Sequence, residues 1–291
     1  MPILAAGYNG VIPRGCLIKL QAIYDSLKKA EKKAADLLLT EPDFFANASI
    51  VEAAAKAGCS EATLFRLTKK MGYPGYPELK ADLAEGREPP GTALYNLMEG
   101  DEPERVVAKV FQASIQALQD TLNVLDRHEY QKAVEAICNA RKMVFYGVGD
   151  AAAVALSGYQ KFLRAGMDVQ MPADFDLQLM SVSRMARGDV LIAISHTGKT
   201  KTVLDVVKYA RLHGVTVVSI TNFPVSPLTK NSDIILLTAA FDEHAKGEVI
   251  SKRVTELCIL ESLFANVLLK NKDRCGASLE EATKAVEVNK L

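Results

Sequence analysis

The spacing of apolar residues along the chain changes near residue 143. Before this point apolar residues recur every three or four positions, as in Ala30, Ala34, Leu37 and Leu38, and this spacing predicts amphipathic helices. After it, short β-branched runs alternate with helical segments. This alternation predicts a parallel sheet with helices on both faces. We therefore expect an α/β chain with an all-α N-terminal domain and a C-terminal doubly wound parallel sheet. The β-branched runs that alternate with helical segments cover residues 143–149, 168–171, 189–195, 215–220 and 234–237.

Glycine and proline are concentrated in one segment, which reads as a linker. A chain of 291 residues also exceeds the usual size of a single domain. We predict a first domain over residues 1–84, a linker over 85–103 and a second domain over 104–291, which opens with helices near 104–125 and 129–140. The glycines and prolines concerned are Gly86, Pro89, Pro90, Gly91, Gly100 and Pro103.

The composition is that of an ordinary globular protein. With 49% hydrophobic and 24% charged residues the chain is not expected to be disordered, and its formal net charge of zero argues against general binding to polyanions. A chain with zero net charge can still carry a local basic face. The sequence has no apolar run long enough to span a bilayer and no secretory signal at its start. These features predict a cytoplasmic protein without a membrane partner.

Cysteine and histidine do not form a metal-binding pattern. The five cysteines are odd in number, widely spaced and without a CxxC pair, which indicates neither a disulfide framework nor a zinc site. The four histidines are not paired at ligand spacing. We therefore predict no metal and no cofactor.

The segment 191–200, LIAISHTGKT, is typical of a phosphate-binding loop. An apolar strand ends there in hydroxyl side chains and a glycine, and a helix follows. Ser195, Thr197 and Thr200 offer hydroxyls, and Gly198 allows the backbone to approach a ligand closely. The following helix points unpaired N–H groups and the positive end of its dipole at the same place. A small phosphorylated ligand is the predicted occupant.

Two nucleotide-binding patterns overlap these residues. Residues 147–152, GVGDAA, fit the loose GxGxxA pattern of a dinucleotide site, with Asp174 at a suitable distance for a ribose contact. No hydride-transfer site accompanies them. Residues 193–200 differ by one position from a P-loop, since Ala193 replaces its first glycine. Because residues 193–195 continue the strand, there is no long loop to wrap a triphosphate, and Lys199 is expected at the surface.

The N-terminal domain contains a helix, a tight turn and a second helix. Ser49 can cap the first helix, Gly58 supplies the permissive turn residue, and Ser60 can cap the second helix. This arrangement predicts a recognition helix in the major groove of DNA. A solvated helix face also explains the lysines, and two short helices joined by a glycine can share this pattern without binding DNA. The predicted DNA-binding residues are Ser60, Thr63, Arg66, Lys69 and Lys70.

Longer segments of the sequence resemble a known family. Residues 48–83, ASIVEAAAKAGCSEATLFRLTKKMGYPGYPELKADL, resemble the helix-turn-helix of RpiR-type bacterial transcription regulators. GVGDAAAVA, DLQLMS, ISHTGKT and TNFPVSPLTKNSD resemble the sugar isomerase (SIS) domain of the same proteins. The resemblance implies a DNA-binding regulator of carbohydrate metabolism whose SIS domain dimerises and senses a phosphosugar, without catalysis. It also implies that the loop matching Ser195, Thr197 and Thr200 binds the phosphate.

One position departs from the family pattern. The family usually has a serine where this chain has Ala151, and Asp150 precedes it. One hydroxyl donor is therefore absent, and a carboxylate is expected close to the phosphate, where repulsion disfavours a dianion. Asp150 can instead bind a hydroxyl or amino group of the sugar, or the site can have lost its ligand. The predicted ligand-binding residues are Gly147, Gly149, Ser195, Thr197, Gly198 and Thr200.

A sugar-phosphate isomerase is the competing interpretation, since the SIS fold also supports aldose–ketose conversion. That reaction needs a base beside the carbonyl. Glu248 and His244 precede the last apolar helix, whereas Glu256 and Glu261 are expected to be charges on its exposed face. An isomerase would also have little use for the N-terminal module.

Other polar residues have two interpretations each. Lys252 and Arg253 can meet a ligand anion or cover the start of a helix. Asp174, Asp176 and Gln178 can contact sugar hydroxyls, and Asp174 can equally cap the next helix.

Regulation by such a protein requires a ligand that binds two states of it differently. We expect a homodimer, or a tetramer built from dimers, whose paired DNA-binding heads contact double-stranded operator DNA. Half-sites would then lie about one helical turn, or a multiple, apart.

Overall fold

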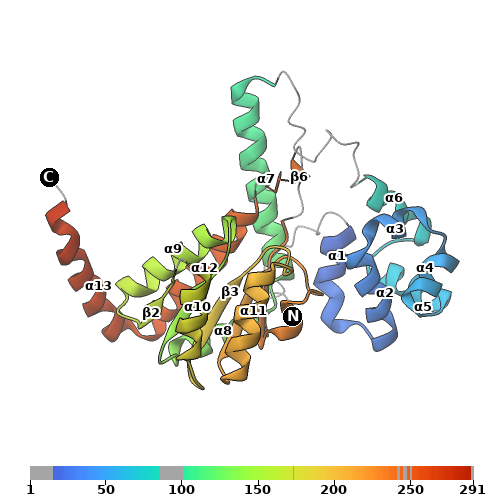
Figure 1. Ribbon diagram of the computed structural model, residues 1–291. Helices are drawn as coiled ribbons and strands as arrows, with labels where there is room; N and C mark the ends of the chain where they lie inside the picture. Colours follow the sequence, from blue (N-terminus) through green and yellow to red (C-terminus); the bar gives the residue numbers. More distant parts are fainter. Residues whose placement is uncertain are drawn as a thin grey trace. The chain divides into compact units, whose positions relative to one another are not determined.

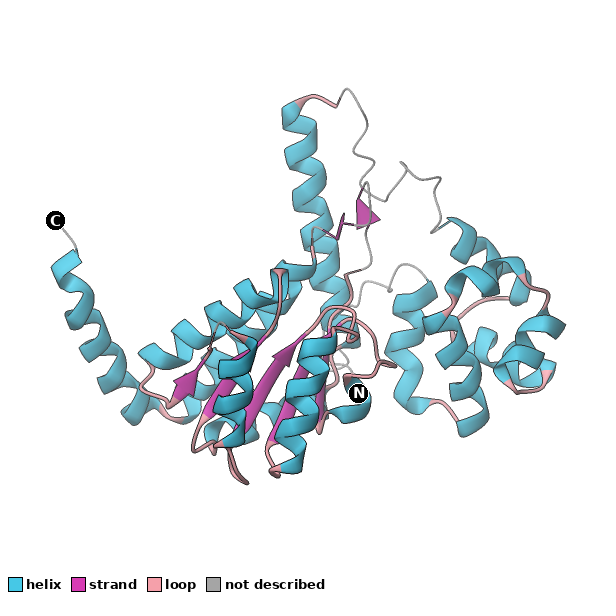
Figure 2. Cartoon of the chain, in the orientation of Figure 1, coloured by secondary structure: helices cyan, strands magenta, loops and turns pink. Residues whose placement is uncertain are grey.

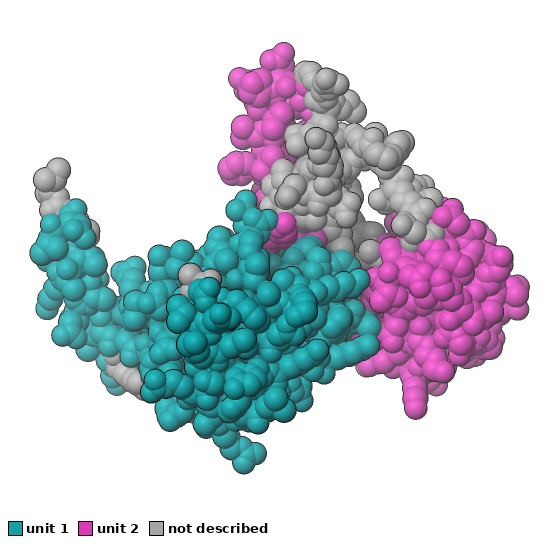
Figure 3. Space-filling view, viewed as in Figure 1, with its two compact units in different colours: residues 1, 126–238, 253–291 teal, residues 2–125, 239–252 magenta. Residues whose placement is uncertain are grey.

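The computed structural model describes residues 16–85, 101–172, 174–240, 243–244, 248–249 and 251–289. The chain divides into two compact units (Figure 3). One contains residues 2–125 and 239–252, and the other contains residues 1, 126–238 and 253–291. The helix at 103–124 therefore packs with the N-terminal unit. The predicted linker falls largely on residues 86–100, outside the described residues, so the predicted domain boundaries stay a prediction.

Between residues 16 and 124, the described part of the N-terminal unit is built from helices (Figure 1). Its core is formed by apolar side chains of these helices, and Leu38, Phe45, Leu64, Leu67 and Leu79 are fully buried. This confirms the helical spacing of the sequence. The elements are α1 (Cys16–Ile23), a 3-10 turn (Tyr24–Ser26), α2 (Lys29–Thr40), α3 (Pro42–Asn47), α4 (Ile50–Ala57), α5 (Glu61–Lys70), α6 (Tyr76–Glu85) and α7 (Pro103–Val124).

The C-terminal unit contains a parallel five-stranded sheet in the order β2-β1-β3-β4-β5 (Figure 2). Every residue of the central strand β3 is buried, as its continuous apolar sequence requires. The doubly wound α/β class is therefore confirmed. The strands of this sheet are β1 (Met143–Tyr146), β2 (Val169–Gln170), β3 (Val190–Ile194), β4 (Thr216–Thr221) and β5 (Ile234–Leu237). A short antiparallel pair, β6 (Glu243–His244) with β7 (Glu248–Val249), belongs instead to residues 239–252 of the N-terminal unit.

Helices cover both faces of the sheet (Figure 1). On one face, Val182 and Val206 pack with Val144 and Leu191 in a continuous buried cluster. On the other face, the Phe162 ring lies between those of Phe145 and Phe264, with centroid distances of 5.6 and 5.3 Å. The helices are α8 (Arg127–Cys138), α9 (Asp150–Arg164), α10 (Phe175–Ser183), α11 (Lys201–Leu212), α12 (Lys252–Lys270) and α13 (Lys272–Val286), with 3-10 turns at Thr229–Asn231 and Glu287–Asn289.

The strand order reverses direction beside β1. From β1 the chain moves outward to β2, and it then returns to place β3 on the opposite side of β1. The loops after β1 and β3 are consequently neighbours, and their helices leave on opposite faces. Ligands bind at this point in open parallel sheets.

Within the described residues, no helix is long and apolar enough to cross a membrane. In the same ranges no group of histidine, cysteine and acidic side chains is arranged to hold a metal ion.

A buried carboxylate fixes the start of β3. The Arg141 guanidinium donates to both oxygens of Asp189, at 2.9 and 2.8 Å, and the Ala186 N–H donates at 2.8 Å. Burial alone would raise the pKa of the fully buried Asp189, but these hydrogen bonds outweigh it and hold the pKa below its ordinary value.

We expect Asp189→Asn to lower the free energy of unfolding by about 2 kcal/mol at pH 7, because the amide leaves buried donors without their acceptors. A lowered pKa stabilises the folded state above the unfolded value, about 3.9, and this contribution is lost as the pH falls through the folded value. The difference between the two proteins should therefore be constant from pH 7 to 5 and shrink below about pH 4. Urea unfolding, followed by circular dichroism at each pH, measures the free energy of unfolding of both proteins. Asp205→Asn, in the exposed pair with Lys201, is the control and should change stability little.

Candidate functional site

The predicted phosphate loop lies at the carboxyl end of β3. Ser195 is 3% exposed, and its hydroxyl lies 3.2 Å from that of Thr200. Thr197 is exposed, and its hydroxyl accepts a hydrogen bond from the Lys199 N–H at 3.3 Å. Thr200 is the N-cap of α11, and its side chain accepts no hydrogen bond from the first turn of that helix. The N–H groups at the start of α11 and three hydroxyls are therefore gathered in one loop.

The backbone of this loop is held from the side of β4. The His196 carbonyl accepts hydrogen bonds from the Asn222 N–H at 3.0 Å and the Thr221 hydroxyl at 3.2 Å. The Gly198 carbonyl accepts one from the Leu228 N–H at 3.1 Å. Gly198 has φ +62°, and a Cβ there would lie 2.3 Å from the Ser226 hydroxyl. The loop is thus preorganised, and its glycine is required by packing as well as by conformation.

The glycines after β1 have separate roles. A Cβ on Gly147 would lie 2.5 Å from the carbonyl oxygen of Ala151, so this residue allows α9 to begin close behind the strand. Gly149 is the N-cap of α9 and has φ +61°, which an L side chain rarely adopts. Because β1 pairs with β3 in register, Tyr146 beside Ala193, this turn lies next to the loop at Ser195. Contact of either glycine with a ligand stays a prediction.

Asp150 is paired with a cation across the site. Its Oδ1 lies 3.9 Å from Nη1 of Arg253, and both side chains are about half exposed. Asp150 is the first residue of α9, where a carboxylate is stabilised by the helix dipole. Arg253 therefore offsets the negative charge that the sequence sets beside the predicted phosphate.

Glu256 is not on an exposed face, and that part of the sequence analysis was wrong. Its side chain is only 1% exposed, and its Oε1 lies 3.9 Å from Nδ1 of His196 in the phosphate loop. The prediction gave the charge of Glu256 more weight than its spacing, since Glu256 lies on the same face of α12 as the buried Ile259, Leu260 and Leu263. By contrast, Glu261 is 47% exposed and pairs with Lys161, as expected of a surface charge. The side chains of Glu248 and His244 fall outside the described residues.

The polar residues after β2 cap and support α10. The Asp174 carboxylate accepts from the N–H groups of Asp176 and Leu177, at 2.9 and 3.1 Å, which confirms that it caps the helix. Gln178 is fully buried and donates from Nε2 to the Pro172 carbonyl. These residues support α10, and the site is carried by the loops after β1 and β3.

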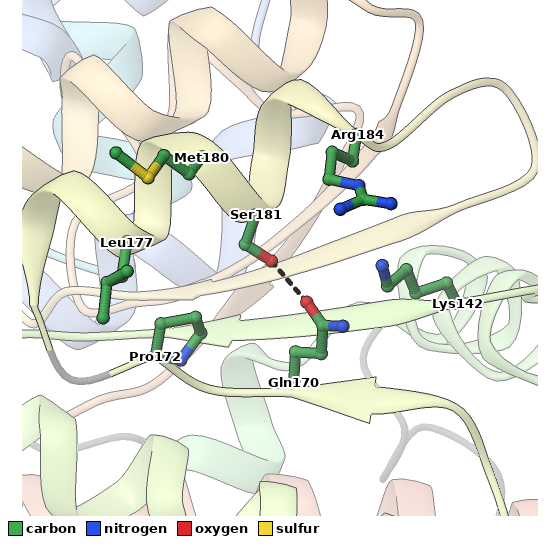
Figure 4. Close-up of a pocket in the computed structure, with 7 residues that line it drawn as sticks. All are labelled: Lys142, Gln170, Pro172, Leu177, Met180, Ser181 and Arg184. Atoms are coloured by element: carbon green, nitrogen blue, oxygen red, sulfur yellow. Dashed lines mark hydrogen bonds between the residues drawn. The ribbon is translucent and has the colours of Figure 1, made fainter.

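A shallow pocket of about 420 Å³ lies between α10 and the edge strand β2 (Figure 4). The Ser181 hydroxyl donates to Oε1 of Gln170 across it, at 2.6 Å. It shares no residue with the phosphate loop. Its lining consists of Lys142, Gln170, Pro172, Leu177, Met180, Ser181 and Arg184.

The helix-turn-helix geometry is present in α4 and α5. Ser49 caps α4, and its hydroxyl accepts from the Glu52 N–H while Glu52 accepts from the Ser49 N–H at 2.7 Å. Gly58 ends α4 with φ +64°, and the Ser60 hydroxyl caps α5 by accepting from the Thr63 N–H at 3.2 Å. Ala53 and Ala54 of α4 and Leu64 and Leu67 of α5 are buried. Each capping feature expected from the sequence is therefore confirmed.

The predicted DNA-binding residues of α5 occupy different environments. Thr63 is only 5% exposed, and its hydroxyl accepts from Nη2 of Arg66 at 3.0 Å and lies 2.9 Å from the Ser60 hydroxyl. Arg66 and Lys69 are exposed. Lys70 is exposed too, but its ammonium lies 2.8 Å from the buried carboxylate of Glu31. Thr63 thus positions Arg66, and the sequence pattern could not distinguish it from a surface hydroxyl.

Comparisons with known proteins match both units. The family model described as "Helix-turn-helix domain, rpiR family" matches residues 14–88, and the model described as "SIS domain" matches residues 136–266. HexR, an HTH-type transcriptional regulator of Pseudomonas aeruginosa, is 32% identical over 88% of this chain and 90% of its own length. An uncharacterized HTH-type transcriptional regulator of Thermotoga maritima is 31% identical over 92% of this chain and 96% of its length.

A solved structure extends the similarity to the whole architecture. The Vibrio vulnificus NanR protein, solved in complex with ManNAc-6P, is 28% identical and has a TM-score of 0.61. The match covers 93% of this chain and 97% of NanR.

The fold and its two sites define a helix-turn-helix DNA-binding regulator of transcription that carries a SIS domain. Full-length relatives above 30% identity make the assignment specific. The chain belongs to the RpiR family of transcriptional regulators.

Proposed function

We propose that this regulator binds operator DNA through α5 and that a phosphorylated sugar bound at the loop 195–200 changes its affinity for that DNA. The observation that carries the proposal is the convergence of three hydroxyls on the N-terminus of α11 at the switch point of the sheet. The similarity to NanR, solved with ManNAc-6P, supports the same class of ligand. The enzymatic alternative is weaker, since the relatives are named as regulators.

The charges around the loop are compatible with a phosphate dianion. Asp150 alone would repel it, but Arg253 lies 3.9 Å from that carboxylate and leaves a nearly neutral pair. The attraction then comes from the helix N-terminus and from the hydroxyls of Ser195, Thr197 and Thr200. We assign to Asp150 the discrimination among sugars, through hydrogen bonds that it accepts from a hydroxyl or amino group. Gly147, Gly149 and Gly198 would bring backbone N–H groups close to the ligand.

On the DNA side, α5 presents an exposed cationic face. Arg66 and Lys69 are exposed, and Lys70 shares its charge with Glu31. We assign Arg66, with Ser60 beside it, to base edges, and the two lysines to phosphates. Thr63 acts through Arg66.

We infer that two copies pair through α7. Its exposed side carries an apolar stripe at intervals of four and seven residues, and Phe111 in this stripe is 67% exposed. Gln112 and Gln119, which flank the stripe, are uncharged, so two identical faces can meet without repulsion. A dimer of this kind supplies the paired heads that a palindromic operator requires. The stripe contains Val107, Phe111, Ile115 and Leu122.

Replacing Arg66 with Ala is expected to weaken operator binding and to relax sequence preference at one position of each half-site, by about 1–3 kcal/mol. Lys69→Ala should instead weaken binding to all sequences alike and reduce the salt slope by about one. Fluorescence anisotropy against the gene's upstream DNA, with an unrelated duplex as competitor, measures both. Lys208→Ala removes the same charge from an exposed site on α11 and is the control. Unchanged operator affinity in the Arg66 variant would refute the assignment of α5.

For the ligand site, Thr197→Val is expected to weaken binding of sugar phosphates about tenfold, because a hydrogen bond to a charged group is lost. Asp150→Asn should strengthen binding of glucose 6-phosphate about fivefold, because it removes a neighbouring negative charge. Isothermal titration calorimetry with glucose 6-phosphate and glucosamine 6-phosphate separates the possible roles of Asp150. Weaker binding of only the amino sugar would mean that Asp150 contacts its ammonium group. A Thr197→Val protein with an unchanged effector response would overturn the loop assignment.

The contact between His196 and Glu256 favours a second candidate, an aldose–ketose isomerase, since a buried carboxylate beside the loop is a candidate base. We expect no catalysis. Incubating the protein with glucose 6-phosphate in D₂O and following the C2 proton by NMR tests this, because an enediol intermediate would exchange that proton with solvent. Exchange that disappears in a Glu256→Gln variant would establish the isomerase instead.

A further inference from the structure

An aromatic ring stands on the exposed face of α5. Phe65 is 44% exposed, and Ala62, Arg66 and Lys69, which share its side of the helix, are exposed as well. The opposite side of α5 is filled by buried residues, Leu64 and Leu67 among them. Phe65 is therefore not needed for the packing of α5 against α4. It places a large apolar group on the face that the proposed function directs at DNA.

The surroundings of the ring restrict what can cover it. The Lys69 ammonium lies 5.5 Å from the centroid of the Phe65 ring, and Arg66 follows it directly in the chain. An apolar protein surface that covered the ring would have to desolvate these two cations without a compensating charge. DNA offers phosphates to the cations and an apolar group beside them, so it matches the patch in both charge and polarity.

Thymine supplies that apolar group. In the major groove each base pair shows a distinct set of groups, and the C5-methyl of thymine is the apolar one among them. Phenylalanine has no hydrogen-bonding group, so the contact it can make with a base edge is with this methyl. We propose that Phe65 is a specificity-determining residue that selects thymine in each operator half-site through contact of its ring with the 5-methyl group. The inference rests on the proposed DNA-binding function of α5.

The orientation of Arg66 determines where the thymine should lie in the half-site. Its guanidinium is held by the Thr63 hydroxyl, at 3.0 Å, and so leans toward the N-terminal end of α5, the end that contacts base edges in this class of protein. Successive residues of a helix project about 100° apart, so Phe65 and Arg66 must contact different base pairs. The preferred half-site should contain a thymine close to the guanine that Arg66 selects.

The test begins with operator selection. The full-length protein is used to select binding sequences from a random duplex library, and each thymine of the selected operator is then replaced singly by deoxyuridine, which lacks only the methyl group. Affinity is measured by fluorescence anisotropy at fixed salt for wild type, Phe65→Ala and Phe65→Leu. At one symmetry-related pair of thymines the wild type should lose about fourfold in affinity per methyl, the effect of one buried CH₂ group. Phe65→Ala should show no loss there, and Phe65→Leu should keep part of it.

The possible outcomes separate this inference from the function on which it rests. Selection of a defined operator by wild type supports the proposed DNA binding, whatever the deoxyuridine results are. If no thymine methyl affects wild-type affinity, or if Phe65→Ala loses as much as wild type at the same position, Phe65 does not read thymine. If no sequence is selected, the proposed function fails and the inference fails with it. Circular dichroism of Phe65→Ala confirms that its helices are intact.

Discussion

The pairing of β1 with β3 is the constraint on which the ligand site depends. These strands are far apart in the sequence but adjacent in the sheet, and β1 is flanked on its other side by β2. Because both strands run in the same direction, the turns that follow them emerge side by side, and α9 and α11 begin there on opposite faces. The hydroxyls at 195–200, the glycines at 147–149 and the carboxylate of Asp150 are neighbours for this reason alone. The salt bridge between Arg141 and Asp189 fixes the other end of β3.

Both proposed binding surfaces recognise anions, yet they do so by different means. The loop at 195–200 uses neutral hydroxyls and backbone N–H groups, and the full charges nearby, Asp150 and Arg253, are paired with each other. The surface of α5 uses the full charges of Lys69 and Lys70 for phosphates. A rigid neutral site suits a small ligand that must be distinguished by shape, whereas exposed full charges suit a polymer whose phosphates repeat along a groove.

Most of the fold could be predicted from the sequence, because β-branched runs and helix caps act over short distances. Ser49, Gly58 and Ser60 illustrate this, since each has the local role that its residue type and neighbours indicate. The misjudged residues depend on tertiary packing. The approach of Glu256 to His196 joins two distant segments of the chain, and the charge balance at Asp150 depends on Arg253, more than one hundred positions later. Local spacing carries no signal for such contacts.

The hydrogen bond between Thr63 and Arg66 has a consequence for how operator preference can evolve. An arginine side chain that is already ordered in the free protein gives up less conformational freedom when it meets a base than one that moves freely. The residue that restrains it is itself buried and need not touch DNA. Substitutions at this hidden hydroxyl can therefore alter the discrimination among operators while every side chain exposed on the recognition helix stays the same.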